Sequence, residues 1–480
     1  MDMILLTSAA ALLVWGAVFL RIAGLWGCIL ATLIAGTVFG HPFAHVSILT
    51  LDRALLSVCL IVYAAYRWYG LEERTPWHWL DSILVCFAAS MILSTFMSDW
   101  RTNTSTSIGK LIFFFLMPIC IYWLGSRVLL TPVHVRWMFG VFACMGIYLS
   151  LTAIAEKFGF EWAVFPRYIV DPSYFEFLGR GRGPLLNPTG NGVLLTLGMC
   201  CALMFLANAG KLRRVAIVSM IPIYLIGIYC TLTRCVWIGG AAALVGTAWV
   251  ATPKRLRIPF AFAVIFGGGL LVAVKSESFV GFKRDKNVSV ADMKQSAHLR
   301  PILAAFAWEM FLDRPMLGCG TGQYLPNVKN YLGERNIDLP LTKAKLYVQH
   351  NVFLALLVEN GLIGLLPFMV LISCSIWLAW QLWQAKQLAL EYRQSGLVFL
   401  GFMAAYLANG MFHDLLIVPM VGAYLFFFLG CIRNLTGNHL VSMNRLALSI
   451  ERGKLPCSTS TTSTRSPSLR LSKSAIRPGS

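Results

Sequence analysis

The sequence predicts an all-α, polytopic membrane protein, and composition, hydropathy and segment length each point to that fold class. Of its 480 residues, 58% are hydrophobic and only 13% are charged, and the mean hydropathy is +0.69. A soluble domain has about half of its residues apolar and about a quarter charged. Apolar runs of about 20 residues, the length that a membrane-crossing helix requires, recur along the chain. Because lipid offers the backbone no hydrogen bonds, we expect these runs to be helices.

The apolar runs define the expected spans in order. They are 3–20, 22–39, 47–68, 80–97, 108–130, 134–155, 189–208, 212–232, 235–252, 257–275, 350–380, 394–412 and 414–433. Only Arg21 separates the first two, so they form either two spans or a hairpin that does not cross fully. We therefore expect about 12 or 13 membrane-crossing helices.

Lysine and arginine occur in alternate connections between these runs. The positive-inside rule places such connections in the cytoplasm. Their basic residues are Arg67, Arg74, Arg127, Arg136, Lys211, Arg213, Arg214, Lys254, Arg255, Arg257, Lys386 and Arg393. The outward-facing connections are then 98–107, 156–188, Thr233-Arg234, 276–350 and His413-Asp414.

The net charge of +19 does not indicate a nucleic-acid-binding protein. The basic residues lie mainly in the short connections and in the C-terminal tail, a distribution typical of membrane orientation signals. The 13 cysteines are scattered, mostly inside apolar runs, and their spacing matches neither a metal site nor a disulfide framework. No cofactor and no metal is expected, because the outward connections contain no HExxH and no paired carboxylates at metal-binding spacing.

Composition divides the chain into five expected parts. They are a transmembrane scaffold (1–155), a transmembrane region with arginine-bearing outward loops (156–275), one large outward loop with short helices (276–350), C-terminal transmembrane helices (351–433), and a tail (434–480). The tail is basic and rich in serine and threonine, which predicts a disordered cytoplasmic segment near anionic lipid. In the large loop, apolar residues at helical spacing predict a helix over 302–312, followed by a turn at Gly318, Gly320 and Gly322.

Arginines at outward positions are the first candidate site residues. Arg180 and Arg182 lie in a glycine-rich run, where backbone approaches a ligand closely and guanidinium groups bind phosphate. Arg234 lies between two apolar runs, where a cation either snorkels to water or serves an anionic ligand. Arg300 precedes the helix of the large loop and is a third candidate cation. For the glycine-rich run, an ordinary basic interfacial loop is an equally good interpretation.

Two further candidates open the next apolar run. His350 begins it, and a neutral histidine accepts a proton near pH 7, although a histidine at a helix start is also a common interfacial residue. Glu359 lies within the run, where an ionisable residue is expensive and indicates function. Glu359-Asn360-Gly361 alternatively marks a helix break.

The order of these segments resembles the O-antigen ligase superfamily, which includes related surface-polysaccharide polymerases. The resemblance covers about residues 175–370, and the N-terminal half matches only as a hydrophobic scaffold. It rests on the Arg-Gly…Asn-Pro run within 179–192, Thr233-Arg234, Arg300, Pro315-Met316-Leu317-Gly318-Cys319-Gly320, and His350-Asn351 followed by Glu359-Asn360-Gly361-Leu362-Ile363-Gly364. The family usually has Ser-Arg where this chain has Thr233-Arg234, so a hydroxyl is kept.

The resemblance implies a multi-pass glycosyltransferase of the bacterial inner membrane with its active site facing the periplasm. It would move a glycan from undecaprenyl diphosphate to a hydroxyl of a lipid A-core-like acceptor or another glycan, without metal or nucleotide and with inversion. Arg180 or Arg182 would bind the diphosphate together with Arg234, and Arg300 would support that site. His350 would be the general base and Glu359 a supporting residue.

Two alternatives remain open from the sequence. A polysaccharide polymerase uses the same donor chemistry, so the arginines do not discriminate it from a ligase. A polysaccharide or lipid transporter would carry charges through several spans and show symmetry between its halves. Here the irregular polar features gather in the second half of the chain instead.

Overall fold

The computed structural model describes residues 2–44, 50–71, 75–262, 290–331 and 348–451. Over these ranges the chain is helical and contains no strand, which confirms the all-α fold class. The helices are α1 (Asp2–Ala44), α2 (Leu51–Trp68), α3 (Trp79–Met97), α4 (Thr104–Lys110), α5 (Met117–Arg127), α6 (Pro132–Phe158), α7 (Pro188–Met204), α8 (Lys211–Cys230), α9 (Arg234–Ala251), α11 (Val290–Asp313), α12 (Tyr324–Val328), α14 (Val352–Gln384), α15 (Leu390–Gly410) and α16 (Pro419–Glu451). The chain divides into a unit of Met1–Thr436, described below, and a unit of Gly437–Ser480.

Seven helical segments of the described chain are long and apolar enough to cross a membrane, which confirms a polytopic membrane protein. They are Leu20–Gly40, Trp79–Met97, Thr106–Arg127, Pro132–Phe158, Lys211–Cys230, Val352–Gln384 and Pro419–Gly437. Two shorter apolar helices, Pro188–Met204 and Arg234–Val250, lie between them in the sequence. The other expected spans also fall on helices, except that 257–275 lies largely outside the described residues.

Several helices differ in detail from the sequence-based expectation. The expected spans 3–20 and 22–39 both fall within α1, which consists of two helices joined at a kink at Gly24, where φ is 64°, close to the expected boundary at Arg21. α11 begins at Val290 and continues through Pro301, ahead of the expected start at residue 302. α16 continues past Arg433, the expected end of the last span, because the following residues are still rich in leucine and other helix formers.

The expected amphipathic helix within the large loop is confirmed. The apolar stripe of Leu303, Phe306, Ala307 and Met310 lies on α11, and all four side chains are buried. These side chains form a small hydrophobic core with Tyr324 of α12 and with the beginning of α14. The described part of the large loop is therefore packed onto the transmembrane helices.

The core of the first unit is organised around the beginning of α16. Phe427 and Phe428 are fully buried and contact Phe142 of α6 at ring distances of 6.0 and 5.8 Å. Asp81 of α3, also buried, accepts bonds from Arg127 (3.0 Å) and from Arg433 (2.8 Å). This charge cluster fixes α3, α5 and α16 to one another.

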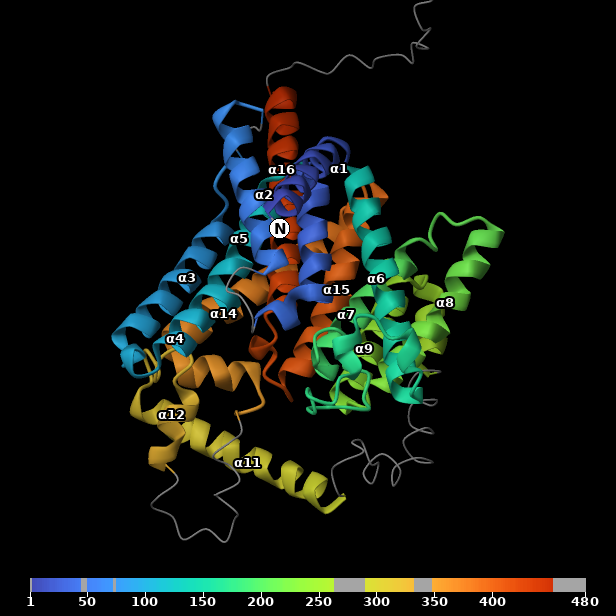
Figure 1. Ribbon diagram of the computed structural model, residues 1–480. Helices are drawn as coiled ribbons and strands as arrows, with labels where there is room; N and C mark the ends of the chain where they lie inside the picture. The colour runs from blue at the N-terminus through green and yellow to red at the C-terminus, as the bar shows by residue number, and fades with distance from the viewer. Residues whose placement is uncertain (1, 45–49, 72–74, 263–289, 332–347, 452–480) are drawn as a thin grey trace, which may run out of the picture. The chain divides into compact units, whose positions relative to one another are not determined.

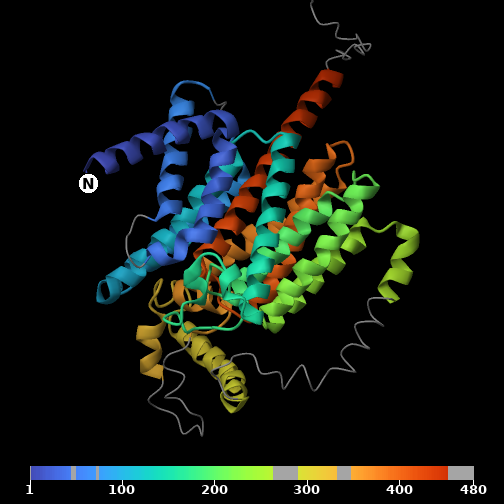
Figure 2. The ribbon, with the colours of Figure 1, turned by 45° about the vertical axis from the view of Figure 1, so that its right-hand side comes forward.

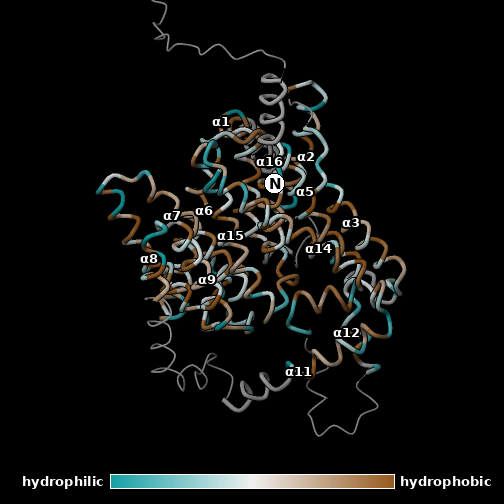
Figure 3. The backbone as a smooth tube through the Cα atoms, turned by 180° about the vertical axis from the view of Figure 1, so that it is seen from behind, coloured by the Kyte–Doolittle hydropathy of each residue, from teal (hydrophilic) through white to brown (hydrophobic). Residues whose placement is uncertain are grey.

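The ribbon places the polar connections of interest at one end of the helices (Figures 1 and 2). Residues 159–187, α11 and α12 lie there, whereas the connection between α14 and α15 lies at the other end. Figure 3 shows hydrophobic residues along most of the helices and hydrophilic residues concentrated in the connections. The candidate residues of the sequence fall at the first of these ends.

Candidate functional site

The glycine-rich loop that carries Arg180 and Arg182 is held by the end of α6. The carboxylate of Glu156 accepts bonds from the backbone N–H of Arg182 (3.2 Å) and of Gly183 (2.8 Å). The N–H of Gly181 donates to the carbonyl of Cys230 at the end of α8 (2.8 Å). Two transmembrane helices therefore fix the loop from both sides.

The side chain of Arg182 binds backbone carbonyls of the segment that precedes it. It is fully buried, and its guanidinium donates to the carbonyls of Ile169 (2.6 and 3.1 Å), Glu176 (2.5 Å) and Tyr174. A buried guanidinium that meets carbonyls in this way satisfies its donors inside the protein. Its geometry is that of a loop clamp.

Arg180 points elsewhere and reaches the start of α9. Its Nη2 donates to the hydroxyl of Thr233 (2.6 Å) and its Nε to the carbonyl of Thr231 (3.3 Å). Thr233 is the N-cap of α9, and Arg234 is the first residue of that helix. Arg180 and Arg234, which are more than fifty residues apart in the sequence, are thus neighbours at a helix N-terminus. A helix N-terminus with adjacent arginines is electropositive.

Arg300 and His350 join the same cluster. The pKa of His350 is lowered to about 4, mainly by burial and further by the positive charge of Arg300. The imidazole is therefore neutral at pH 7, the state in which it accepts a proton. Arg300 is exposed on α11, and so presents its charge at the surface of the cluster.

A second histidine, which sequence reasoning missed, lies against the first. The rings of His350 and His413 are stacked, with centroids 5.8 Å apart and planes at 20°. The pKa of His413 is lowered to about 3 by burial, then by His350, Arg300 and Arg180. Its Nε2 lies 3.3 Å from the amide nitrogen of Asn187. The only sequence signal for His413 was its place in a short outward connection beside Asp414.

Asparagine side chains hold both histidine-bearing segments. Asn351 caps α14, where its Oδ1 accepts from the N–H groups of Phe353 (2.8 Å) and Leu354 (3.0 Å). Its Nδ2 donates to the carbonyl of Met411, next to the His413 turn (3.0 Å). Asn187 caps α7 in the same manner. The caps fix the two rings relative to one another.

The backbone is strained around this cluster. Over the described residues, the non-glycine residues with positive φ are Phe177 (58°), Leu186 (48°), Leu232 (50°) and His350 (52°). Leu232 and Leu186 adjoin the Thr233 and Asn187 caps, and the ring of Phe177 lies 5.0 Å from the guanidinium of Arg180. Such strain costs on the order of 1–3 kcal/mol for each residue and concentrates at functional sites. Its distribution therefore marks the same place as the arginines.

Glu359 lies at a break in α14. Gly361 has φ 64° and ψ −166°, so α14 consists of two helices that run in different directions (Figure 1). The sequence left open whether Glu359 marks function or a helix break, and the break is present. Glu359 accepts from the ammonium of Lys110 at 2.8 and 3.0 Å. Lys110 is the second residue that sequence reasoning missed, because its place in an apolar segment gave no sign of a partner.

The predicted glycine turn fills this break. The N–H groups of Cys319 and Gly320 donate to the carbonyls of Val358 and Glu359, both at 2.8 Å. Gly318 has φ 70°, and a Cβ there would lie 2.5 Å from the carbonyl oxygen of Val358. Only glycine fits such a conformation and approach. The turn thus supplies donors for carbonyls that the broken helix leaves without intrahelical partners.

Asp414 connects the break to the histidines. It is buried, and burial raises its pKa to about 6, opposed by Lys110 and reinforced by Glu359. Among the residues that the structure describes, no three His, Cys, Asp or Glu side chains are grouped as metal ligands.

The Lys110–Glu359 pair is expected to stabilise the break. The side chains are 15% and 6% exposed, so Glu359→Gln leaves a buried ammonium without its counter-charge. We expect the free energy of unfolding to fall by about 3–5 kcal/mol, as for other buried pairs that lose one partner. Thermal unfolding of the purified protein in detergent measures this.

The pair of Arg136 and Glu391 provides the matched control. These groups are 3.5 Å apart and the arginine side chain is 56% exposed, so Arg136→Met should change stability by about 0–1 kcal/mol. Recovery of stability in the double variant Lys110→Met/Glu359→Leu would support the ion pair. Equal losses in Glu359→Gln and Arg136→Met would contradict it.

Part of the chain matches the model of a known protein family. Residues 215–369 match the family model described as O-Antigen ligase, which confirms the resemblance over that region. No curated protein matches the chain. The matched region contains Arg234, Arg300, His350 and Glu359, whereas Arg180, Lys110 and His413 lie outside it. The match supports a membrane protein that acts in polysaccharide ligation or polymerisation.

Proposed function

We propose that this protein is an inner-membrane glycosyltransferase that moves a glycan from undecaprenyl diphosphate to an acceptor hydroxyl at the periplasmic face. The observation that supports this most is that Arg180, Arg234, Arg300 and His350 come from separate elements to one region, in which several non-glycine residues have positive φ. The match to O-Antigen ligase over 215–369 supports the reaction class. The acceptor is a lipid A-core-like saccharide or another glycan.

The reaction is a single displacement at the anomeric carbon. The acceptor oxygen attacks that carbon, the bond from the carbon to the diphosphate oxygen breaks, and the electron pair leaves with the undecaprenyl diphosphate. His350, neutral at pH 7, takes the proton of the acceptor hydroxyl. Attack opposite the leaving group gives inversion.

The arginines stabilise the leaving diphosphate. Arg234 lies at the N-terminus of α9, where helix N–H groups add to its positive charge. Preorganised cations in a site that excludes water are among the largest contributions to catalysis. We propose that they serve where other glycosyltransferases use a divalent metal, so that a chelator should leave transfer unchanged. Glu359 has a supporting role through the break that it stabilises.

Of the two loop arginines, we propose Arg180 as the diphosphate ligand and Arg182 as the clamp. Arg180→Ala should lower transfer by about 100-fold and leave the protein folded, because this side chain donates to one carbonyl and one hydroxyl. Arg182→Ala should instead lower the thermal stability, because three carbonyls lose a buried donor. Thermal unfolding and transfer assays on both variants separate the roles. A folded, inactive Arg182→Ala protein would reverse the assignment.

The final step separates a ligase from a polymerase. Deletion of the gene in its host should leave long glycan chains on undecaprenyl diphosphate if the protein is a ligase. Single repeat units on the lipid or acceptor would instead indicate a polymerase. If the protein is a transporter, its deletion should leave the lipid-linked glycan on the cytoplasmic face, where externally added glycosidase does not reach it.

A further inference from the structure

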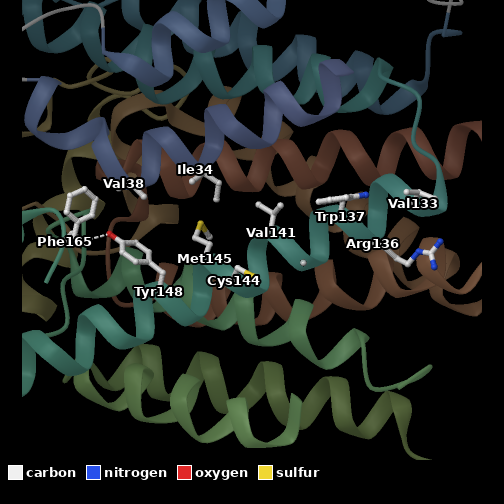
Figure 4. A pocket seen from close by; sticks show the side chains of 11 residues that line it. Ile34, Val38, Val133, Arg136, Trp137, Val141, Cys144, Met145, Tyr148 and Phe165 are labelled. Atoms are coloured by element: carbon white, nitrogen blue, oxygen red, sulfur yellow. Dashed lines mark hydrogen bonds between the residues drawn. The ribbon is translucent and has the colours of Figure 1, made fainter. Parts of the chain in front are cut away.

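An apolar groove runs along α6 beside α1 (Figure 4). Its volume is about 920 Å³, near the upper end of the range for ligand pockets. The lining residues are Ile34, Val38, Val133, Arg136, Trp137, Gly140, Val141, Cys144, Met145, Tyr148 and Phe165. Except for the guanidinium at one end and the hydroxyl at the other, these groups are apolar and suit a hydrocarbon ligand.

The length of the groove favours a particular kind of hydrocarbon. Its lining extends along α6 from Val133 to Tyr148, a rise of roughly 22 Å at ~1.5 Å per residue. One leaflet of a bilayer contributes only about 15 Å of hydrocarbon, half of the core thickness. A chain that fills the groove is therefore longer than the hydrocarbon of one leaflet, and a polyprenyl chain matches that length better than a phospholipid tail.

The Tyr148 end of the groove adjoins the candidate site. Tyr148 donates to the carbonyl of Phe165 (2.6 Å). The hydroxyl of Tyr168 lies 3.0 Å from the carbonyl oxygen of Val38, in the groove wall, and 2.7 Å from that of Pro184, in the arginine-bearing loop. The groove wall and that loop are thus linked through one side chain.

The opposite end is not built as an anion site. Arg136 lies there, but its guanidinium is already paired with Glu391 at 3.5 Å. Arg180, by contrast, reaches the N-terminus of α9 at the other end. A lipid with an anionic head at the arginine cluster and a long tail in the groove matches both features.

We propose that this groove holds the polyprenyl chain of the lipid-linked donor. The proposal rests on the function proposed above and assigns the place of the donor tail. The diphosphate lies at the arginine cluster, and the chain passes the Tyr148 and Phe165 rings into the groove. Burial of a long isoprenoid there makes donor binding depend on chain length.

A bulky substitution in the groove tests this dependence. Val141 is half-buried and projects into the groove, so Val141→Trp should obstruct it (Figure 4). We expect kcat/KM to fall by about 10-fold for an undecaprenyl diphosphate glycan. The same glycan on geranyl diphosphate, too short to fill the groove, should be used equally by variant and wild type. Val218→Trp, at a position 50% exposed on α8, is the matched control and should affect neither donor.

Photo-crosslinking gives a readout that does not require transfer. Undecaprenyl diphosphate with a diazirine in its chain should label α6 between residues 133 and 148, and Val141→Trp should abolish that label. Equal losses with both donors in Val141→Trp, or label distributed equally over α8, would overturn the proposal. So would labelling of the groove by a diazirine phospholipid that undecaprenyl diphosphate does not displace. Groove labelling without any transfer would instead refute the proposed function and leave the lipid site intact.

Discussion

Replacing Arg234 by alanine is expected to lower kcat/KM for glycan transfer by about 100- to 1000-fold. Arg234 is the first residue of α9, beside Thr233, which binds Arg180, and we propose that its guanidinium binds the leaving diphosphate. Removal of one preorganised donor to such a charge costs on the order of 10²–10³ in rate. Initial rates with purified protein and an undecaprenyl diphosphate glycan measure the loss.

Two variants make the Arg234 result specific. Arg234→Lys keeps the charge but loses the forked donor geometry, so it should recover only part of the activity. Arg167 is exposed and its guanidinium donates to the carbonyl of Glu161 (2.6 Å), so Arg167→Ala should have nearly wild-type activity. Wild-type kinetics in Arg234→Ala would remove the arginine cluster from the mechanism.

Replacing His350 by alanine should lower kcat by about 100- to 10,000-fold, the range for loss of a general base. The protein should stay folded, because Asn351, and not His350, caps α14. His413→Asn should cost only about 2- to 10-fold, since it removes a stacked ring and leaves the base in place. A larger loss in His413→Asn than in His350→Ala would mean that the two histidines exchange roles.

The pH dependence of the wild type follows from the lowered pKa of His350. The imidazole is neutral above its pKa of about 4 and charged below it. Transfer by the folded protein should therefore stay constant from pH 7 down to about pH 5 and fall as the pH approaches 4. An unfolded histidine binds its proton near pH 6.5, so the half-buried neutral ring of His350 also makes the fold less stable as the pH falls from 6.5 to 4. A transfer rate that halves near pH 6.5 would contradict a His350 base whose pKa is lowered to about 4.

Much of the fold was predictable from the sequence because local hydrophobicity identifies membrane helices. The apolar runs fall on helices wherever the structure describes them, and the 302–312 stripe is buried as its spacing indicates. What hydropathy does not encode is conformation within an apolar run. The break at Gly361 depends on the positive φ of one residue and on a distant turn that binds the freed carbonyls.

The candidate site was predictable only in part, for a related reason. Arg180, Arg234, Arg300 and His350 stood out because polar residues at the edges of spans are costly. The difference between Arg180 and Arg182 is tertiary, since the two lie in one loop and only the carbonyls of Ile169, Tyr174 and Glu176 reveal the clamp. His413 stacks on His350, 63 residues away in the sequence, and Lys110 binds Glu359, 249 residues away. No local sequence pattern reveals contacts over such separations.

The most direct test of the central claim is a transfer assay with the purified protein in the presence of a chelator. The assay supplies undecaprenyl diphosphate glycan and candidate acceptors in turn, and measures free undecaprenyl diphosphate and the anomeric configuration of the product. We predict one undecaprenyl diphosphate released for each glycan transferred, an inverted linkage, and no effect of the chelator. Transfer that requires a divalent metal, or that proceeds with retention, would contradict the proposed chemistry of the arginine cluster and His350.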